Sequence, residues 1–565
     1  MLVAFALSGA SVVWAQPKKP APARAPVRKK PPAAASTSAA SSASAGPTTS
    51  AAPDAEPAPS AKPVDSGGDV VERIDLGDAR TSSSSAAPVA SASASAVSAS
   101  AIDEDKEGFQ LRAWARTRGS AALRGDDAIA NEKPGLRVPF DSAVGEQQLF
   151  LRLRYARGKS FEAVASGLLG YTLGAHTAYD PGAATLITSA RGFYEASLRE
   201  AYVGFFTAIA DFRIGQQRIA WGNSDAFTPN EVINPRDLRD PILAETEVFR
   251  LPVLAARADI AMGFADLQLV AAPFFVPDRV DAYGTNWAFI QPSAPPPLRG
   301  LFARLAGAID PSLQGDLQPL LRQTRLPAYD LSGASAGTKL SWTTGSLDVA
   351  HYYHYGYTYA PALTIDPTLL RGIATTDWTR ATDTDIAAIL AAISGGQFQS
   401  NYRRRHHVGT SAQVVARPFL FRVDGSYDTA SVFTDRTLLG VVRPVAQGVL
   451  GVEYQTGEIG KTIIVEGYYA RILGDPLATP LLGALTDTVS VASVLRWTFF
   501  EHVELELRGV AGIRPMGYTV RPQLAYKRDA WEVRAGVVWL DGEDGSLPRY
   551  YRRNSSVYAM VKHAF

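Results

Sequence analysis

The sequence predicts an all-β membrane protein: a closed, antiparallel transmembrane β-barrel of about eighteen strands, with sixteen also compatible. Three observations lead to this fold class. Stretches of roughly ten residues alternate between apolar and polar side chains, as strands with two different faces must. The connections between them alternate between short and long. The last stretch ends on an aromatic residue, Phe565, as closing strands of outer-membrane barrels do.

Two segments precede the predicted barrel, which occupies residues 106–565. Residues 1–15 are apolar or small and predict a signal peptide cut before Gln16, although the usual basic start is missing, as it would be if the true start codon lay upstream. Residues 16–105 consist mainly of Pro, Ala and Ser and predict a disordered periplasmic tether, since they cannot bury enough apolar surface to fold. Its basic clusters, 18–19 and 28–30, are candidates for binding the cell wall or a periplasmic partner.

Composition excludes several classes of protein. Lys and Arg total 56 against 55 Asp and Glu, so the charge gives no reason to expect nucleic acid as a partner. The chain has no cysteine, which excludes disulfides, a lipoprotein anchor and thiolate metal sites. After the first segment no run of eighteen apolar residues occurs, so membrane crossing is expected through strands.

The alternating stretches place the strands. In residues 531–539, for example, apolar residues alternate with Glu532 and Arg534. We predict strands that start near residues 109, 146, 161, 193, 211, 255, 265, 337, 346, 402, 418, 446, 460, 488, 501, 517, 530 and 554. Pro522 is a weak point, because proline cannot donate to a strand ladder.

The connections predict the topology. Short turns, such as 157–159 and 207–208, are expected in the periplasm, and long ones, such as 275–335 and 359–401, outside; 514–517 is short although it should lie outside. Both barrel termini then lie in the periplasm. A soluble β-helix or sandwich would share the alternation but not the alternating turn lengths together with the ending at Phe565. We interpret Phe565 as a signal for the barrel-assembly machinery and expect lipid and lipopolysaccharide around the barrel.

Aromatic residues near strand ends predict girdles at the two membrane interfaces. They are Tyr155, Tyr171, Trp342, Tyr468, Tyr469, Trp497, Tyr526 and Trp539.

Charged residues fall on one face of the predicted strands, which we interpret as the channel lining. They are Arg112, Arg116, Arg152, Arg154, Arg213, Arg257, Arg405, Arg422, Asp424, Glu453, Glu466, Arg496, Glu504, Glu506, Arg508 and Arg534. Arginine dominates the N-terminal strands, which favours a mild preference for anionic or polar solutes. The alternative is that paired charges merely solvate the wall.

Three motifs lie close together: LREAYV at 198–203, RIGQQRIAWG at 213–222 and INPRDL at 233–238. They resemble the LREAYV, GRQxxxWG and INPxDL signature of a family of uncharacterised Gram-negative porin-like outer-membrane barrels, which are related in look to alginate-export-like and substrate-selective porins. The resemblance implies the architecture more firmly than the solute. Gln216 departs from it, because the family commonly has arginine there, and so does the long tether.

The same segment is a candidate constriction. Gly222 lets the chain leave a strand sharply, and Asn234-Pro235 forces an extended turn, so residues 221–249 are predicted to fold into the lumen. The alternative is an outer loop that caps the barrel. Residues 298–326 and 375–393 show helical spacing and predict amphipathic helices at the mouth or on the outer leaflet. The constriction residues are Trp221, Gly222, Asn223, Asp225, Asn234, Pro235, Arg236 and Asp237.

No motif of a hydrolase, metalloprotease or phosphate-binding loop occurs, so we predict no enzyme activity and no cofactor. His351 and His354 face opposite sides of a strand, as do His406 and His407, which predicts no metal site unless another strand supplies ligands. The sequence therefore predicts a porin-like outer-membrane channel for small solutes. Two alternatives remain: an export outlet for a hydrophobic or polymeric molecule that works with a periplasmic partner, and a closed structural or surface-adhesion barrel.

Overall fold

The structure, a computed structural model, describes residues 107–124, 141–176, 194–280, 285–291, 293–294, 298–301, 331–378, 380–392, 397–455 and 461–565. The predicted signal peptide and tether lie outside the described residues. The domain boundaries at 15 and 105 therefore stay predictions.

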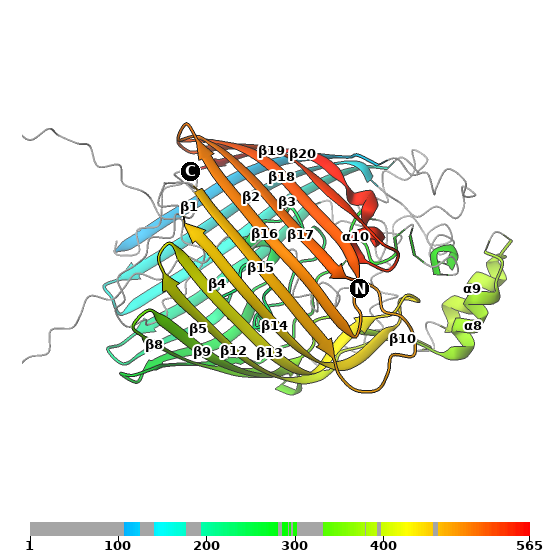
Figure 1. Ribbon diagram of the computed structural model, residues 1–565, viewed down its shortest axis with the longest axis horizontal. Coiled ribbons are helices and arrows are strands. Elements are labelled where there is room, and N and C mark those ends of the chain that lie inside the picture. Colours follow the sequence, from blue (N-terminus) through cyan, green and yellow to red (C-terminus); the bar gives the residue numbers. More distant parts are fainter. Residues whose placement is uncertain are drawn as a thin grey trace, which may run out of the picture.

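Eighteen strands form one closed antiparallel barrel, in which each strand pairs with its neighbours along the chain (Figure 1). The barrel closes where the first strand pairs with the last, from Trp114 opposite Ala564 to Ala122 opposite Ser556. The first nine strands are β1 (Gly108–Ala122), β2 (Asp141–Arg157), β3 (Phe161–His176), β4 (Tyr194–Phe206), β5 (Ala210–Gln217), β6 (Val253–Ala261), β7 (Asp266–Ala272), β8 (Ser335–Thr344) and β9 (Leu347–Tyr357). The others are β12 (Arg404–Ala416), β13 (Phe419–Thr434), β14 (Gly440–Gln455), β15 (Lys461–Ile472), β16 (Asp487–Phe499), β17 (Val503–Arg514), β18 (Met516–Arg528), β19 (Trp531–Gly542) and β20 (Ser556–Ala564). The predicted fold class is confirmed.

Sixteen of the predicted strand starts lie within two residues of the observed ones, and β2 and β14 begin five and six residues earlier than predicted. Both early segments, DSAVG and GVVRPV, lack a clear alternation of polar and apolar residues. Pro522 is accommodated within β18. The pairing with β19 skips it, and on the other side it lies opposite Leu507.

Apolar side chains point outward along the strands and polar ones point into the barrel. In β15, Ile463 and Val465 are exposed on the outer face, while Thr462 and Glu466 are buried inside. The outer face is therefore suited to lipid, because lipid-facing and lumen-facing positions alternate in a membrane barrel. The girdle prediction is wrong for Tyr468, which is buried in the lumen, whereas its neighbour Tyr469 faces outward.

The short turns lie at one end of the barrel and the long connections at the other. Residues 158–160, 345–346 and 529–530 are short turns at the end where the C-terminus lies. The N-terminal end of β1 and the C-terminal end of β20 both lie there, and the Phe565 backbone N–H donates to the Ala113 carbonyl. The connection between β17 and β18 is short although it belongs to the other end, as the sequence indicated.

Two helices project from the end with the long connections (Figure 1): α8 (Pro367–Thr375) and α9 (Asp383–Ala392). The side chain of Asp366 caps α8 by accepting the N–H of Thr368 at 2.8 Å. A small separate hairpin of β10 (Ala362–Ile365) and β11 (Phe398–Asn401), which the sequence did not predict, connects them to the barrel. Helix α9 falls within the predicted helical range 375–393, whereas α8 precedes it.

Two shorter helices lie near the lumen, α4 (Thr246–Phe249) and α10 (Leu547–Tyr550). Residues 298–301 are also helical, and the rest of the predicted range 298–326 lies outside the described residues. Within the part of the chain that the structure describes, no helix has the length and apolar character needed to cross a membrane.

Three consecutive strands, β5, β6 and β7, are short, with eight, nine and seven residues. The last pair between β5 and β6 is Gln217 opposite Val253. The intervening residues, 218–252, leave the wall there and run through the interior. The barrel wall is therefore short at these three strands, because the chain between β5 and β6 enters the lumen.

Candidate functional site: a loop across the lumen

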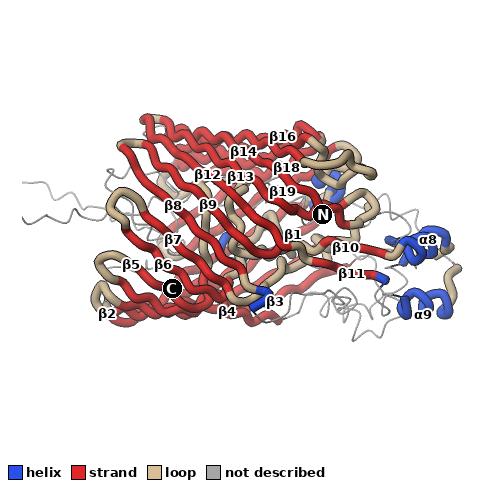
Figure 2. Tube along the Cα trace, turned by 90° about the horizontal axis from the view of Figure 1, so that it is seen from below, coloured by secondary structure: helices blue, strands red, loops and turns tan. Residues whose placement is uncertain are grey.

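We call residues 218–252 the lumen loop. An outer loop would be exposed, but most of the described side chains of this segment are buried and the others half-buried, and Phe227 and Asn230 have no exposed surface. Figure 2 shows loop segments inside the barrel, behind the strands of the near wall. The structure therefore places the loop in the lumen and not over the mouth as a cap.

The side chain of Asn234 ties the two ends of the lumen loop together. Its Oδ1 accepts the N–H of Ile219 at 2.8 Å, and its Nδ2 donates to the carbonyl of Leu251 at 2.7 Å. An amide can do both at once, because it carries an acceptor and a donor. Asn234 thus keeps the neck of the loop narrow where it leaves and rejoins the wall.

On one side of the lumen, two carboxylates of the wall bind the backbone of the loop. Asp424 of β13 accepts the N–H of Asn223 at 3.1 Å and that of Ser224 at 2.9 Å. Glu466 of β15 accepts the next three N–H groups, those of residues 225, 226 and 227, at 2.6, 2.8 and 3.1 Å. Five consecutive amides are therefore satisfied by two buried carboxyl side chains, and each such buried N–H would cost about 1–3 kcal/mol if it were left without an acceptor.

Side chains reinforce this anchor. Asp225 forms an ion pair with Arg422 at 2.8 Å, and Arg422 also pairs with Glu453 of the neighbouring strand at 2.5 Å. The ring of Phe227 stacks on Tyr468, with 5.0 Å between centroids. The tip of the loop is thus fixed on β13, β14 and β15.

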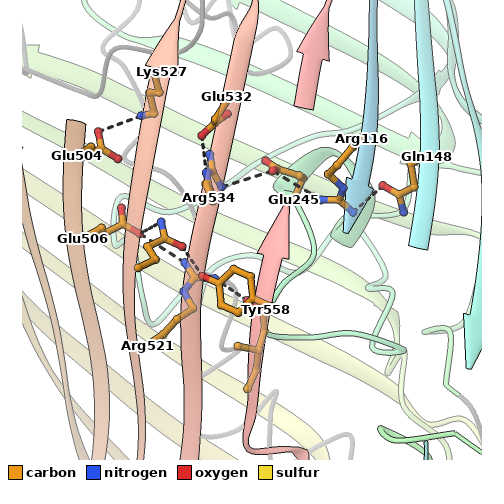
Figure 3. A network of polar contacts seen from close by, with 12 residues as sticks. Arg116, Gln148, Glu245, Glu504, Glu506, Arg521, Lys527, Glu532, Arg534 and Tyr558 are labelled. Atoms are coloured by element: carbon orange, nitrogen blue, oxygen red, sulfur yellow. Dashed lines mark hydrogen bonds and ion pairs between the residues drawn. The ribbon is translucent and has the colours of Figure 1, made fainter. Parts of the chain in front are cut away.

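On the opposite side, cations of the wall bind acidic and carbonyl groups of the loop (Figure 3). The Glu245 carboxylate lies between Arg116 of β1 and Arg534 of β19, at 3.6 Å from each. Arg521 of β18 donates to the carbonyl of Ile242 at 2.8 Å. Burial would raise the pKa of Glu245, but Lys562, Arg534 and Arg116 outweigh burial and hold that pKa well below its usual range. Glu245 is therefore ionised.

Further contacts complete a belt around the lumen. Asp240 pairs with Arg118 of β1. The Trp221 indole N–H donates to Gln268 of β7 at 2.6 Å, and Asn230 donates to the Thr410 carbonyl of β12 at 3.1 Å. The lumen loop thus contacts walls on all sides and spans the barrel.

Residues 174–546 match the family described as "Protein of unknown function (DUF1302)". The chain belongs to this family. The matched range covers about two thirds of the chain and includes all three motifs of the resemblance.

Solved porins are similar in fold to this DUF1302 protein, at low sequence identity. Acinetobacter baumannii OccAB1 has a TM-score of 0.45 at 9% identity, covering 83% of this chain and 98% of that one. A BenF-like porin from Pseudomonas fluorescens Pf-5 has 0.43 at 7%, covering 82% and 99%. Pseudomonas aeruginosa OccK5 has 0.41 at 9%, covering 81% and 98%. The comparison with curated proteins gave no match.

The structure places the predicted channel-lining side chains of the DUF1302 protein inside the barrel, mostly in ion pairs. Arg496 lies 2.9 Å from Glu506, and Arg213 lies 3.3 Å from Glu162. Arg422, Asp424 and Glu466 are among those that hold the lumen loop. Their part in passage stays a prediction. The remaining members, at inward, buried or half-buried positions, are Arg112, Arg116, Arg152, Arg154, Arg257, Arg405, Glu453, Glu504, Arg508 and Arg534.

The predicted constriction residues are all in the lumen loop, but they differ in role. Trp221 and Asp225 bind the wall, and Asn234 closes the neck. The backbone N–H of Arg236 donates to Asp278 at 2.7 Å, and Asp237 pairs with Arg239. In these contacts both residues bind other connecting segments and not a strand of the wall.

The sequence missed the anchors on the arginine side, Glu245, Asp240 and Arg118. Arg118 continues the inward alternation of Arg112 and Arg116 and could have been found by extending it. The acidic partners lie in a segment without periodicity, where the sequence gives no signal.

The histidine prediction needs refinement. His354 and His407 lie directly opposite each other on β9 and β12, and both are buried in the lumen, a juxtaposition that spacing within one strand cannot reveal. His407 Nδ1 lies 3.0 Å from a carboxylate oxygen of Asp428. Over the described ranges, no group of three or more His, Cys, Asp or Glu is placed to hold a metal ion.

Proposed function

We propose that this DUF1302 protein is a porin-like channel of the bacterial outer membrane that passes small solutes, with the lumen loop as its constriction. The observation that carries the proposal is the double anchorage of the loop: Asp424 and Glu466 hold it on one wall, and Arg116 and Arg534 hold it on the other. A loop held on both walls at the level of the short strands narrows the path at a fixed place.

The outer face supports the membrane placement. Leu151, Leu450, Val465 and Leu524 are among many large apolar side chains that are exposed on the barrel exterior. Such a surface is unfavourable in water and suits hydrocarbon. The end with the short turns, where Phe565 lies, is the periplasmic end in this proposal, because short turns face the periplasm in bacterial barrels.

The charges of the wall suggest which solutes pass. In the sector of β2, β5 and β6, buried arginines share the neighbouring carboxylates, and Glu162 pairs with both Arg154 and Arg213. Arg152 pairs with Glu200, which Arg218 also contacts. Fixed positive charge in a low-dielectric channel concentrates anions and repels cations. The proposed channel therefore prefers anionic or polar solutes.

Planar-bilayer recording of the purified full chain tests the proposal. We expect stepwise conductance in potassium chloride and, in a salt gradient, a reversal potential displaced toward that of chloride. Complete silence, in the wild type and in variants with a released loop, would instead support a closed structural barrel. A reversal potential toward that of potassium would contradict the anion preference but not the proposal that the protein is a channel.

A further inference from the structure

The inner wall changes character along β16 to β19. Toward the short-turn end it carries Arg496, Glu506 and Arg534, all buried and inward. Toward the end with the long connections, the buried inward residues of these strands are uncharged: Thr488, Ser490, Ala492, Thr519, Val538 and Leu540. A wall that only guided ions would not need this uncharged part.

A pocket lies against the uncharged part of the wall, and none of its lining residues is charged. We call it the apolar pocket. Ile242 of the lumen loop, Leu540 of the wall and Leu547 of α10 line it, and all three side chains are buried. Glycines at 483, 512 and 517 also line it and leave room, because they carry no side chain. Helix α10 lies at the end with the long connections (Figure 1), so the pocket is on that side of the lumen loop.

Four side chains that line the apolar pocket carry a hydroxyl, and two of these hydroxyls are used within the protein. Thr488 and Ser546 donate to backbone carbonyls at 3.2 and 2.8 Å. Ser490 and Thr519 are 4% and 3% exposed, and no residue that the structure describes forms a hydrogen bond with either hydroxyl. A buried hydroxyl without a partner is unfavourable. These two hydroxyls are therefore available to a ligand.

The positions of the two hydroxyls indicate the size of the ligand. Ser490 is on β16 and Thr519 on β18, and both strands pair with β17. Neighbouring strands are about 4.8 Å apart, so β16 and β18 are separated by about 10 Å. Glycine 512 of β17 lies between them and lines the pocket. A single six-membered ring with one polar group can therefore lie across β17 and reach either hydroxyl.

The lining selects against charged molecules. An ionised group would lose its hydration in the apolar pocket without meeting an opposite charge, and an unpaired buried charge is far more costly than a buried polar group. An apolar ring gains from leaving water. A hydroxyl or carbonyl group on that ring can pair with Ser490 or Thr519, because a hydroxyl both donates and accepts.

We propose that the apolar pocket binds a compact, uncharged molecule that has an apolar body and one hydroxyl or carbonyl group, which hydrogen-bonds to Ser490 or Thr519. This inference goes beyond the proposed function, which concerns the solutes favoured by the arginines of the wall. It does not depend on conduction, because a barrel closed by its lumen loop would bind the same molecule.

Calorimetric titration of the purified full chain tests this site, with cyclohexanol as the probe and a detergent-only titration as the blank. We expect saturable binding of cyclohexanol. Cyclohexanecarboxylate and cyclohexylammonium, which carry either charge on the same ring, should bind at least about tenfold more weakly. Ethanol, which has the hydroxyl without the ring, should also bind at least about tenfold more weakly. Binding of both charged rings as tight as that of cyclohexanol, or no saturable binding of cyclohexanol, would overturn the proposal.

A large side chain in the pocket tests its location. Thr519→Phe fills the apolar pocket and should weaken binding of cyclohexanol by about tenfold or more. Thr462→Phe is the matched control, because Thr462 is an inward, buried threonine of β15 that does not line the pocket. Unchanged binding in Thr519→Phe, with heat-modifiable mobility showing a folded barrel, would overturn the proposal.

A milder variant tests the hydrogen bond. The double variant Ser490→Ala and Thr519→Val removes both free hydroxyls with little change in volume, and it should weaken binding of cyclohexanol by about fivefold. Ser493→Ala is the control, because Ser493 is an exposed serine of the same strand as Ser490 but on the outer face. Unchanged binding in the double variant would overturn the proposed hydrogen bond.

Bilayer recording of the same preparation separates the two proposals. A conducting barrel that does not bind cyclohexanol refutes this site and leaves the channel. A barrel that binds cyclohexanol but never conducts refutes the channel and leaves the site.

Discussion

The two anchors of the lumen loop use opposite chemistry. On the β13 and β15 side the wall supplies the carboxylates, and the loop contributes mainly backbone N–H groups. On the β1 and β19 side the wall supplies arginines, and the loop contributes the Glu245 carboxylate. The first anchor therefore depends on wall residues and is insensitive to most side chains of the loop. The second depends on particular loop side chains.

The largest effect is expected at the backbone anchor. Glu466→Leu leaves the N–H groups of residues 225–227 without their acceptor. We expect the free energy of unfolding to fall by about 4 kcal/mol, since each buried unsatisfied group costs about 1–3 kcal/mol. Hydrogen exchange of these amides should become much faster. Glu504→Gln is the control, because Glu504 pairs with Lys527 of the wall and not with the loop. Unchanged protection of residues 225–227 in Glu466→Leu would contradict the anchor.

A smaller effect is expected at the side-chain anchor. Glu245→Gln removes the charge between Arg116 and Arg534 and should reduce the free energy of unfolding by about 2 kcal/mol, measured by urea titration in lipid vesicles. Since the pKa of Glu245 is held well below its usual range, its contribution is present above pH 4.5 and is lost only in strong acid. A contribution that disappeared between about pH 8 and pH 5 would therefore argue against this ion pair.

Trp221 connects the neck of the loop to the wall. Trp221→Phe keeps most of the ring that packs on Tyr352 but loses the hydrogen bond to Gln268. We expect a loss of about 1.5 kcal/mol in the free energy of unfolding, measured by the same titration. Gln268→Leu should cause a larger loss, because it also removes the hydrogen bond that Gln268 donates to Asp259, and the double variant should lose less than the sum of the two. Full additivity would show that the two residues do not interact.

The smallest effect concerns pH. Burial raises the pKa of Asp278 to about 6, although Arg236 opposes the shift. The stability that protonated Asp278 contributes is fully present below pH 3.8 and is lost as the pH rises through about 6. Between about pH 5 and pH 7 we expect a decrease of about 1 kcal/mol or less. Asp278→Asn should remove this decrease, and an unchanged pH profile in that variant would assign the titration to another group.

The strands of the barrel wall were predictable because inward and outward side chains alternate with a period of two residues in every strand. Alternation indicated the inward position of Asp424 and Glu466, and the WGN and INPRDL motifs indicated an inward loop. What these carboxylates bind was not predictable, because the partners are backbone amides some 200 residues away. Because every residue except proline carries a backbone N–H group, the sequence does not indicate which of these groups a carboxylate binds.

The arginine side was less predictable for a different reason. Glu245 and Asp240 belong to a segment without periodicity, so neither its path nor its partners follow from spacing. The opposition of His354 and His407 likewise depends on the register between two strands separated by a long connection. Register of this kind is set by tertiary pairing and not by local sequence.

The most direct test of the account is the single-channel conductance of the double variant Asp424→Asn and Glu466→Gln, recorded beside the wild type and the Glu504→Gln control. Both changes weaken the hold on residues 223–227 while leaving the loop sequence intact. We predict a larger or more variable conductance in the double variant and no change in the control. An identical conductance in all three proteins would contradict the claim that the anchored lumen loop constricts the channel.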